Sequence, residues 1–195
     1  MKAAPSMLDF TVPKTNTAID AVAIFLGSLF LVLGAKVSIP LPFTPVPITG
    51  QTFSVLVIGS MLGSTRAPLS VLLYVAYGIF GFPVFAENSS GVSILMGATG
   101  GYILGFVLAA YVIGKLSEKG WDRTAGKSLL AMTIGHALIF AIGLLWLIPF
   151  VGASQVLAKG FYPFILGSIV KTLLAGTTAS VGWTALKKIK GSFHG

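Results

Sequence analysis

The sequence predicts an all-α integral membrane protein with six transmembrane helices and both termini in the cytoplasm. Of its 195 residues, 55% are hydrophobic and only 9% are charged, whereas soluble domains are roughly 45–50% apolar and 25% charged. The mean hydropathy is +0.93. Because a membrane span needs about 20 apolar residues, the chain has room for about six spans and for no separate soluble domain.

The expected helices are apolar runs bounded by glycine, proline or charge. These runs are continuously apolar and do not alternate, which argues against strands of a transmembrane barrel. The chain is therefore interpreted as a single transmembrane domain, residues 1–195. Its helices are expected near residues 18–35, 51–64, 67–85, 98–116, 128–150 and 161–186.

Residues 1–17 are expected to form a short cytoplasmic arm, because they contain an acid and prolines and lack the apolar core of a signal peptide. In the first helix, Ala23 and Gly27 are four residues apart. Small residues at this spacing allow close helix approach. They suit either an internal helix contact or a contact with a partner.

Residues 36–50 are predicted to form a stiff, non-helical loop that caps a pocket on the outer face. In PFTPVPITGQT, each proline fixes its own φ angle and favours extended geometry in the residue before it. Such a segment is tolerated at membrane depth only beside protein or a water-filled cavity. Gln51 then offers an amide donor and a carbonyl acceptor at a helix start.

Two helices, at 51–64 and 67–85, are expected to form a tight hairpin across LGSTRAP. The following outer loop, GFPVFAENSSG, contains Glu87 and Asn88. The side chain of Asn88 can both donate to and accept from an amide-like ligand. A solvated turn explains the same residues, since Asn, Ser and Gly favour turns.

The helix at 98–116 carries small residues every four positions, at Gly97, Gly101, Gly105 and Ala109. This pattern predicts close packing against a neighbouring helix. Thr99 and Tyr102 lie at its outer end, where their hydroxyl groups are candidates to face the capped cavity.

His136 stands alone in the helix at 128–150 and is expected to be a hydrogen-bonded core or interface residue. The chain has no cysteine, no HExxH motif, no readable pair of acids and no GxxxxGK[ST] loop. No catalytic residue, metal site or cofactor is therefore expected.

Lys171 lies well inside an expected span, 161–186. A cation near the bilayer centre costs at least about 2.5 kcal/mol, so it normally faces a polar cavity or an anionic partner. It lies about ten residues, roughly 15 Å, from the outer helix end, too far for its side chain to reach the interface. Gly167 and Ser168 share its helix face, which predicts a small polar notch suited to a carboxylate or carbonyl ligand.

The remaining basic residues are distributed unequally between the two expected sides. Ten lie with the termini and two, Lys36 and Lys159, lie opposite, which makes the termini cytoplasmic under the positive-inside rule. The net charge of +8 is thus explained by topology, and no nucleic acid partner is expected. The ten are Lys2, Lys14, Arg66, Lys115, Lys119, Arg123, Lys127, Lys187, Lys188 and Lys190.

Four motifs follow one another in this chain, TPVPITGQT, LLYVAYGIFGFPVF, GATGGYILGF and PFxxGxxxK. Together they resemble the BioY family, the biotin-binding S components of energy-coupling factor (ECF) transporters, and the match covers most of the chain from residue 44 to 176. The resemblance implies a multi-pass protein of the cell membrane that captures biotin without chemistry of its own. It also implies docking on an energising module made of a transmembrane scaffold protein and two ABC-type ATPases.

Biotin has a ureido head, an apolar middle and a carboxylate tail. These parts suit a pocket with amide, aromatic and ammonium groups. The orientation of biotin stays open. Ala23 and Gly27 are the candidate contacts with the energising module. The candidate biotin-binding residues are Lys171, Gln51, Asn88, Ser168, Tyr102, Thr49, Thr99, Phe85 and Tyr74.

Two departures from the family pattern bear on this site. Ser168 occupies a position where the family usually has an aspartate, and ENSSG replaces a glycine-rich stretch after PVF. Three alternatives remain: an S component for another small vitamin, a small polytopic membrane enzyme, and a structural helper of a larger complex.

Overall fold

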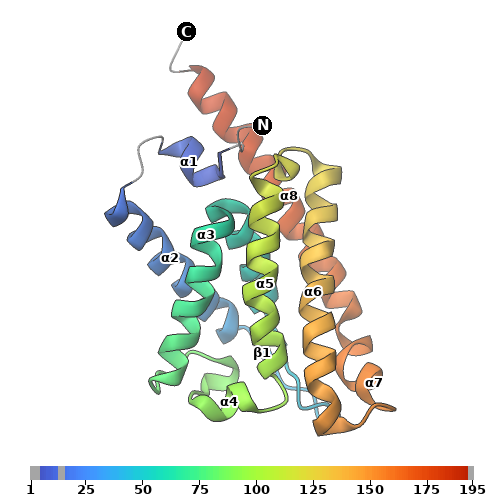
Figure 1. Ribbon diagram of the computed structural model, residues 1–195. Helices are drawn as coiled ribbons and strands as arrows, with labels where there is room; N and C mark the ends of the chain where they lie inside the picture. Colours follow the sequence, from blue (N-terminus) through green and yellow to red (C-terminus); the bar gives the residue numbers. More distant parts are fainter. Residues whose placement is uncertain (1–4, 13–15, 193–195) are drawn as a thin grey trace.

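The computed structural model describes residues 5–12 and 16–192 and is almost entirely helical. Five helical segments are long and apolar enough to cross a membrane, within the part of the chain that the structure describes. Short helices and one small two-stranded sheet connect them (Figure 1). The elements are α1 (Met7–Thr11), α2 (Thr17–Lys36), β1 (Ser38–Ile39), β2 (Ile48–Thr49), α3 (Gln51–Ile79), η1 (Ala86–Asn88), α4 (Val92–Met96), α5 (Gly100–Ser117), η2 (Trp121–Arg123), α6 (Ala125–Val151), α7 (Val156–Gly160), η3 (Tyr162–Phe164) and α8 (Ile165–Ser192).

Helix α3 folds back on itself at Gly63, which has φ 80° and ψ −178°. The amide of Gln51 donates to the hydroxyl of Tyr74 over 2.5 Å, although 23 residues of straight helix would separate them by about 35 Å. The two arms of α3 therefore lie side by side, as the predicted hairpin requires. The second arm ends at Ile79, however, and not at residue 85, because Gly81 takes a φ of +91°.

The remaining predicted helices correspond to α2, α5, α6 and α8, with ends shifted by a few residues. The largest of these shifts is at α8, which begins at Ile165 because Pro163 lies in the preceding turn of 3-10 helix. The short helices α1, α4 and α7 and the sheet within residues 36–50 were not predicted. Lys2 and Lys14, and residues 1–4 and 13–15 of the predicted arm, lie outside the described residues.

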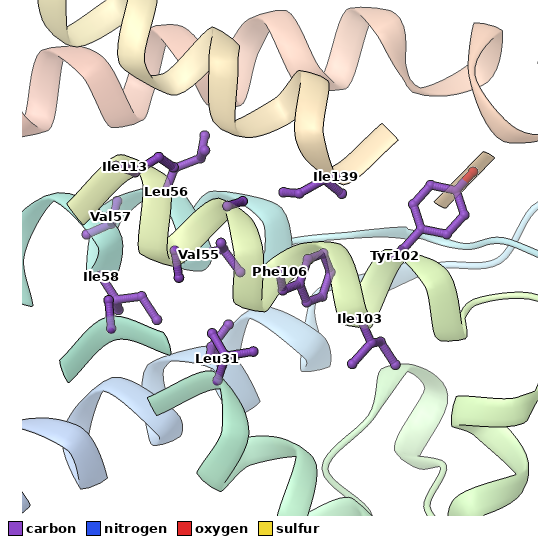
Figure 2. Packing of buried hydrophobic residues seen from close by; sticks show 14 of the residues in the cluster. Leu31, Val55, Leu56, Val57, Ile58, Tyr102, Ile103, Phe106, Ile113 and Ile139 are labelled. Atoms are coloured by element: carbon purple, nitrogen blue, oxygen red, sulfur yellow. The ribbon is translucent and has the colours of Figure 1, made fainter. Parts of the chain in front are cut away.

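The core lies where α3, α5 and α6 pack together. Leu31, Leu56, Phe106 and Ile139 are among its fully or almost fully buried members (Figure 2). The small residues of α5 allow close packing against a neighbouring helix, as predicted. A Cβ atom at Gly105 would lie 3.0 Å from the Ile139 Cα, and one at Gly101 would overlap Trp146, so only glycine allows α5 to approach α6 this closely.

Ala23 and Gly27 are buried inside the bundle. A Cβ atom at Gly27 would lie 2.5 Å from the Ser70 hydroxyl of α3. Of the two roles expected for this pair, the structure therefore favours the internal helix contact. The residues that α2 exposes are large and apolar, such as Val22, Leu26 and Leu33.

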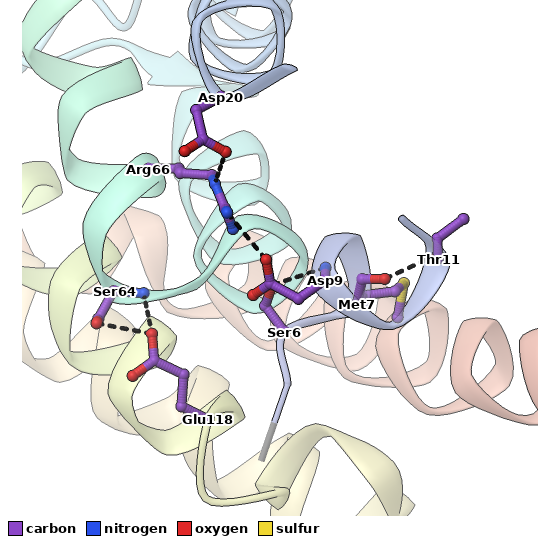
Figure 3. A network of polar contacts seen from close by, with 8 residues as sticks. All are labelled: Ser6, Met7, Asp9, Thr11, Asp20, Ser64, Arg66 and Glu118. Carbon is purple, nitrogen blue, oxygen red and sulfur yellow. Dashed lines mark hydrogen bonds and ion pairs between the residues drawn. The ribbon is translucent and has the colours of Figure 1, made fainter. Parts of the chain in front are cut away.

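The turn of α3, the α5–α6 connection and the C-terminal end of α8 lie at the same end of the molecule as α1 (Figure 1). Arg66 of α3 links α1 and α2 at this end, because its guanidinium contacts Asp9 at 2.9 Å and Asp20 at 2.7 Å. Glu118 accepts from the backbone N–H and the hydroxyl of Ser64 at 2.8 and 2.7 Å (Figure 3). Lys36 and Lys159 lie toward the opposite end.

Candidate ligand-binding cavity

A cavity of about 310 Å³ lies at the end of the bundle opposite the termini. Its walls come from the predicted capping loop, the first turn of α3, the loop after Phe85, the start of α5, the middle of α6 and the outer part of α8. This volume is at the lower end of the range of about 300–1,000 Å³ that is typical of small-molecule pockets.

The capping loop of residues 36–50 forms a short antiparallel hairpin over the cavity. Strand pairing places Ser38 opposite Thr49 and Ile39 opposite Ile48. At the tip, the hydroxyl of Thr44 donates to the carbonyl of Lys159 over 2.6 Å. Pro45, Val46 and Pro47 line the cavity beneath the tip. The predicted non-helical cap is therefore present and is attached to α7.

Lys171 lines the cavity with its side chain only partly exposed. Its ammonium donates to the carbonyl of Thr49 over 2.6 Å and to the hydroxyl of Thr52 over 3.1 Å. Ser168, one helical turn earlier, lines the same wall. Lys171 thus faces the cavity, as expected, and the candidate residue Thr49 contacts it through its backbone.

Gln51, Tyr74 and Phe85 form one cluster at the cavity. Gln51 is 5% exposed and lines the cavity together with Phe85. Tyr74 lies behind them and does not line the cavity. Its hydroxyl accepts from Gln51, and its ring meets the Phe85 ring edge to face, with centroids 5.4 Å apart. Gly78 provides the space for the Phe85 ring, because a Cβ atom there would overlap it.

Thr99 and Tyr102 line the cavity from the N-terminal end of α5, as predicted. The hydroxyl of Tyr102 donates to the carbonyl of Gly160 over 2.9 Å. The ring of Tyr102 is thereby fixed between α5 and the α7–α8 connection.

Asn88 lies outside the cavity lining, contrary to the prediction. Its side-chain oxygen accepts from the ammonium of Lys36 over 2.6 Å, and the same ammonium donates to the carbonyl of Pro83 over 2.6 Å. Glu87 and Asn88 both take positive φ values, 56° and 57°, which non-glycine residues rarely adopt. In this turn Glu87 and Ser89 line the cavity, and Asn88 is exposed beside Lys36.

His136 lies in the cavity wall, which was not predicted. It is hydrogen-bonded, as expected, since its Nδ1 lies 2.8 Å from the Thr172 hydroxyl. Phe140 and Phe164 are further unpredicted members of the wall. A helical stripe could have located His136, because Met132, Gly135 and Ile139 are the buried residues around it on α6.

The arrangement is suited to binding a small, largely apolar ligand with a few hydrogen-bonding groups. Aromatic and aliphatic side chains form most of the wall, and lysine, glutamine, serine, threonine and histidine groups are spaced around it. Within residues 5–12 and 16–192, no three His, Cys, Asp or Glu side chains are grouped to hold a metal ion.

Several proteins with similar sequences carry the name of biotin transporters. The biotin transporter BioY of Thermotoga maritima is 38% identical over 154 residues, which cover 76% of this chain and 86% of that protein. The biotin transporter BioY2 of Lactococcus lactis is 35% identical over 156 residues, covering 77% and 82%. The probable biotin transporter BioY of Rickettsia prowazekii is 32% identical over 162 residues, covering 83% and 82%.

A solved structure has the same fold. The crystal structure of the S-component for biotin from an ECF-type ABC transporter superposes with a TM-score of 0.76 at 22% identity, and the match covers 86% of this chain and 93% of that one. The model of the BioY family matches residues 7–188. Together with the relatives above, this match shows that the chain belongs to the BioY family.

Proposed function

We propose that this protein is the biotin-binding S component of an ECF-type vitamin uptake transporter. The observation that carries the proposal is the capped cavity, which joins an ammonium, an amide and hydroxyl groups around an apolar middle. Biotin has matching parts, namely a polar ureido head, an apolar ring system and chain, and a carboxylate. The names of the relatives support the same ligand.

The protein crosses the cell membrane six times, with both termini in the cytoplasm. The two arms of α3 provide two of the six crossings, and α2, α5, α6 and α8 provide the others. The basic residues near the termini favour this orientation. The cavity then opens toward the outside, where Lys36 and Lys159 lie.

The subunit itself binds and does no covalent chemistry. It docks on an energising module with a transmembrane scaffold protein and two ABC-type ATPases, which hydrolyse ATP. The fold match to an S component of an ECF-type transporter supports such a partner. Binding residues in this proposal are Lys171, Gln51, Ser168, Thr99, Tyr102 and Phe85, with Thr49 and Tyr74 holding Lys171 and Gln51 in place.

Thermal unfolding of the full chain in detergent, with and without biotin, tests the proposal. A ligand that binds only the folded state stabilises it by RT ln(1 + [L]/Kd), about 4 kcal/mol at a thousandfold excess over Kd. We expect biotin to raise the melting temperature and other vitamins, such as thiamine and riboflavin, to leave it unchanged. A shift with a different vitamin alone would reassign the ligand, and no shift with any of them would favour the structural-helper alternative.

A further inference from the structure

His136 has one ring nitrogen in contact with a neighbouring helix and one without a partner. The side chain is 5% exposed and lines the cavity from α6. Its Nδ1 lies 2.8 Å from the hydroxyl of Thr172 on α8. Its Nε2 is buried and has no hydrogen-bond partner among the described residues. A buried polar atom of this kind calls for a partner that arrives from outside the chain.

The contact with Thr172 determines which nitrogen carries the hydrogen. Thr133, Thr177 and Thr178 each donate their hydroxyl hydrogen to a carbonyl four residues earlier in their own helix. Among the described residues, the hydroxyl of Thr172 has no such carbonyl acceptor and instead contacts the imidazole. On this ground we assign its hydrogen to Nδ1, which places the ring hydrogen of the neutral imidazole on Nε2.

A second unused donor lies on the same wall. A lysine ammonium has three N–H donors, and Lys171 uses two of them on Thr49 and Thr52. Lys171 and His136 both line the cavity, and Thr172, the residue after Lys171, contacts the imidazole. A second positive charge beside this ammonium is unfavourable, which keeps the imidazole neutral.

We propose that His136, oriented by Thr172, donates its Nε2–H to an oxygen of the bound ligand and thereby determines ligand specificity together with Lys171. The recognised group is a carbonyl or carboxylate oxygen. In biotin this is either the ureido carbonyl or the carboxylate. The inference rests on the proposed function and assigns one polar contact within it.

Three substitutions separate a donor role from a packing role. His136→Gln keeps an N–H near the position of Nε2, His136→Asn keeps a group only near Nδ1, and His136→Phe keeps ring volume without a donor. We expect about tenfold weaker biotin binding for His136→Asn and His136→Phe, as for one lost hydrogen bond, and a smaller loss for His136→Gln. Thr172→Val should weaken binding as well, whereas Thr172→Ser should retain it.

Titration calorimetry of detergent-purified protein with biotin and with biotinamide measures these losses, and melting temperatures without ligand check the fold. A smaller loss for biotinamide in His136→Asn assigns the contact to the carboxylate, and equal losses assign it to the ureido carbonyl. Unchanged affinity in His136→Asn, or equal losses in the Gln and Asn variants, would overturn the inference. Wild-type protein that fails to bind biotin would instead overturn the proposed function.

Discussion

At the scale of single residues, Lys171 is tied to the cap of the cavity. Its ammonium contacts the backbone of Thr49, the last residue of the capping hairpin, and the side chain of Thr52 in the first turn of α3. These contacts have two effects. They satisfy the charge of Lys171 within a largely apolar bundle, and they link α8 to the segment that covers the cavity. A ligand that contacts Lys171 also acts on the position of the cap.

Substitution of Lys171 by methionine should weaken biotin binding strongly while retaining side-chain length. A charge-assisted hydrogen bond contributes about 1.5–3 kcal/mol, which corresponds to a rise in Kd of about 10- to 150-fold. Calorimetric titration checks this. Lys159→Met is the matched control, because Lys159 lies at the same end of the bundle but does not line the cavity. Equal affinities for the two variants would remove Lys171 from the site.

Some cavity residues could be predicted because they stand out within their own stretch of the sequence. Lys171 is conspicuous because a charge inside an apolar run is costly, and Gln51 because it follows a run of prolines. Asn88 and His136 depend on residues far away in the chain. Asn88 contacts Lys36, 52 positions earlier, and His136 contacts Thr172, 36 positions later. Neither contact leaves a pattern in the neighbouring sequence.

At the scale of elements, the apolar runs predicted the positions and order of the long helices, whereas the helix ends depended on glycine conformation. Gly63 and Gly81 both take positive φ values and end an arm of α3. Many other glycines in the chain lie inside helices as packing residues, so the residue type alone does not reveal which ones turn the chain. The small helices α1, α4 and α7 have five residues each, too few to produce a periodic signal.

Substitution of Gly63 by alanine should destabilise the fold. Its φ of 80° with ψ of −178° belongs to a region that is essentially restricted to glycine, and a Cβ atom would lie 3.0 Å from the Glu118 carboxylate. The expected cost is about 1–3 kcal/mol, or roughly 2–10 °C in melting temperature for a chain of this size. Gly126→Ala is the control, because its Cβ meets nothing within 4 Å and should be neutral or slightly stabilising. A wild-type melting temperature for Gly63→Ala would contradict the turn.

The capping hairpin should control how fast the ligand leaves. Thr44→Val keeps the side-chain shape and removes two hydrogen bonds, the one that the hydroxyl donates to the Lys159 carbonyl and the one that it accepts from the Val46 N–H. Loss of the bond to the Lys159 carbonyl alone, about 0.5–1.5 kcal/mol, should raise the dissociation rate at least about 2- to 12-fold with little change in association. Stopped-flow displacement of a fluorescent biotin derivative measures both rates. Thr184→Val on α8, which removes only a bond to the Ser180 carbonyl within its own helix, should change neither rate.

At the scale of the whole molecule, the two ends of the bundle differ in their chemistry. The cavity end is held by hydrogen bonds of backbone carbonyls, such as those to Thr44, Tyr102 and Lys171. The end with the termini is held by ionised side chains around Arg66 and Glu118 (Figure 3). Changes of pH are therefore expected to act on the carboxylates at the end that we place in the cytoplasm.

The pKa values of two acids outside the spans, Asp122 and Glu118, are shifted in opposite directions. Burial raises the pKa of Asp122, and hydrogen bonds from Ser117 and Trp183 only partly oppose it. Burial also acts to raise the pKa of Glu118, but the hydrogen bonds from Ser64 and the charge of Lys115 outweigh it, so that this pKa is lowered. Because these two shifts have opposite effects on the pH dependence of stability, the contribution of one acid is measured by comparing the wild type with a variant that lacks this acid.

Glu118→Gln should therefore remove a stabilisation that depends on pH. A lowered folded-state pKa means that the contribution of Glu118 is fully present above its ordinary value of 4.5 and is lost as the pH falls below it. Near pH 7 the variant should be less stable by about 1–2 kcal/mol, because the carboxylate is only partly buried. Below pH 4.5 the wild type and the variant should converge. Melting temperatures of both proteins in detergent from neutral to acidic pH measure the gap, and a gap that stays constant or widens on acidification would show that Glu118 does not hold the turn of α3 as a carboxylate.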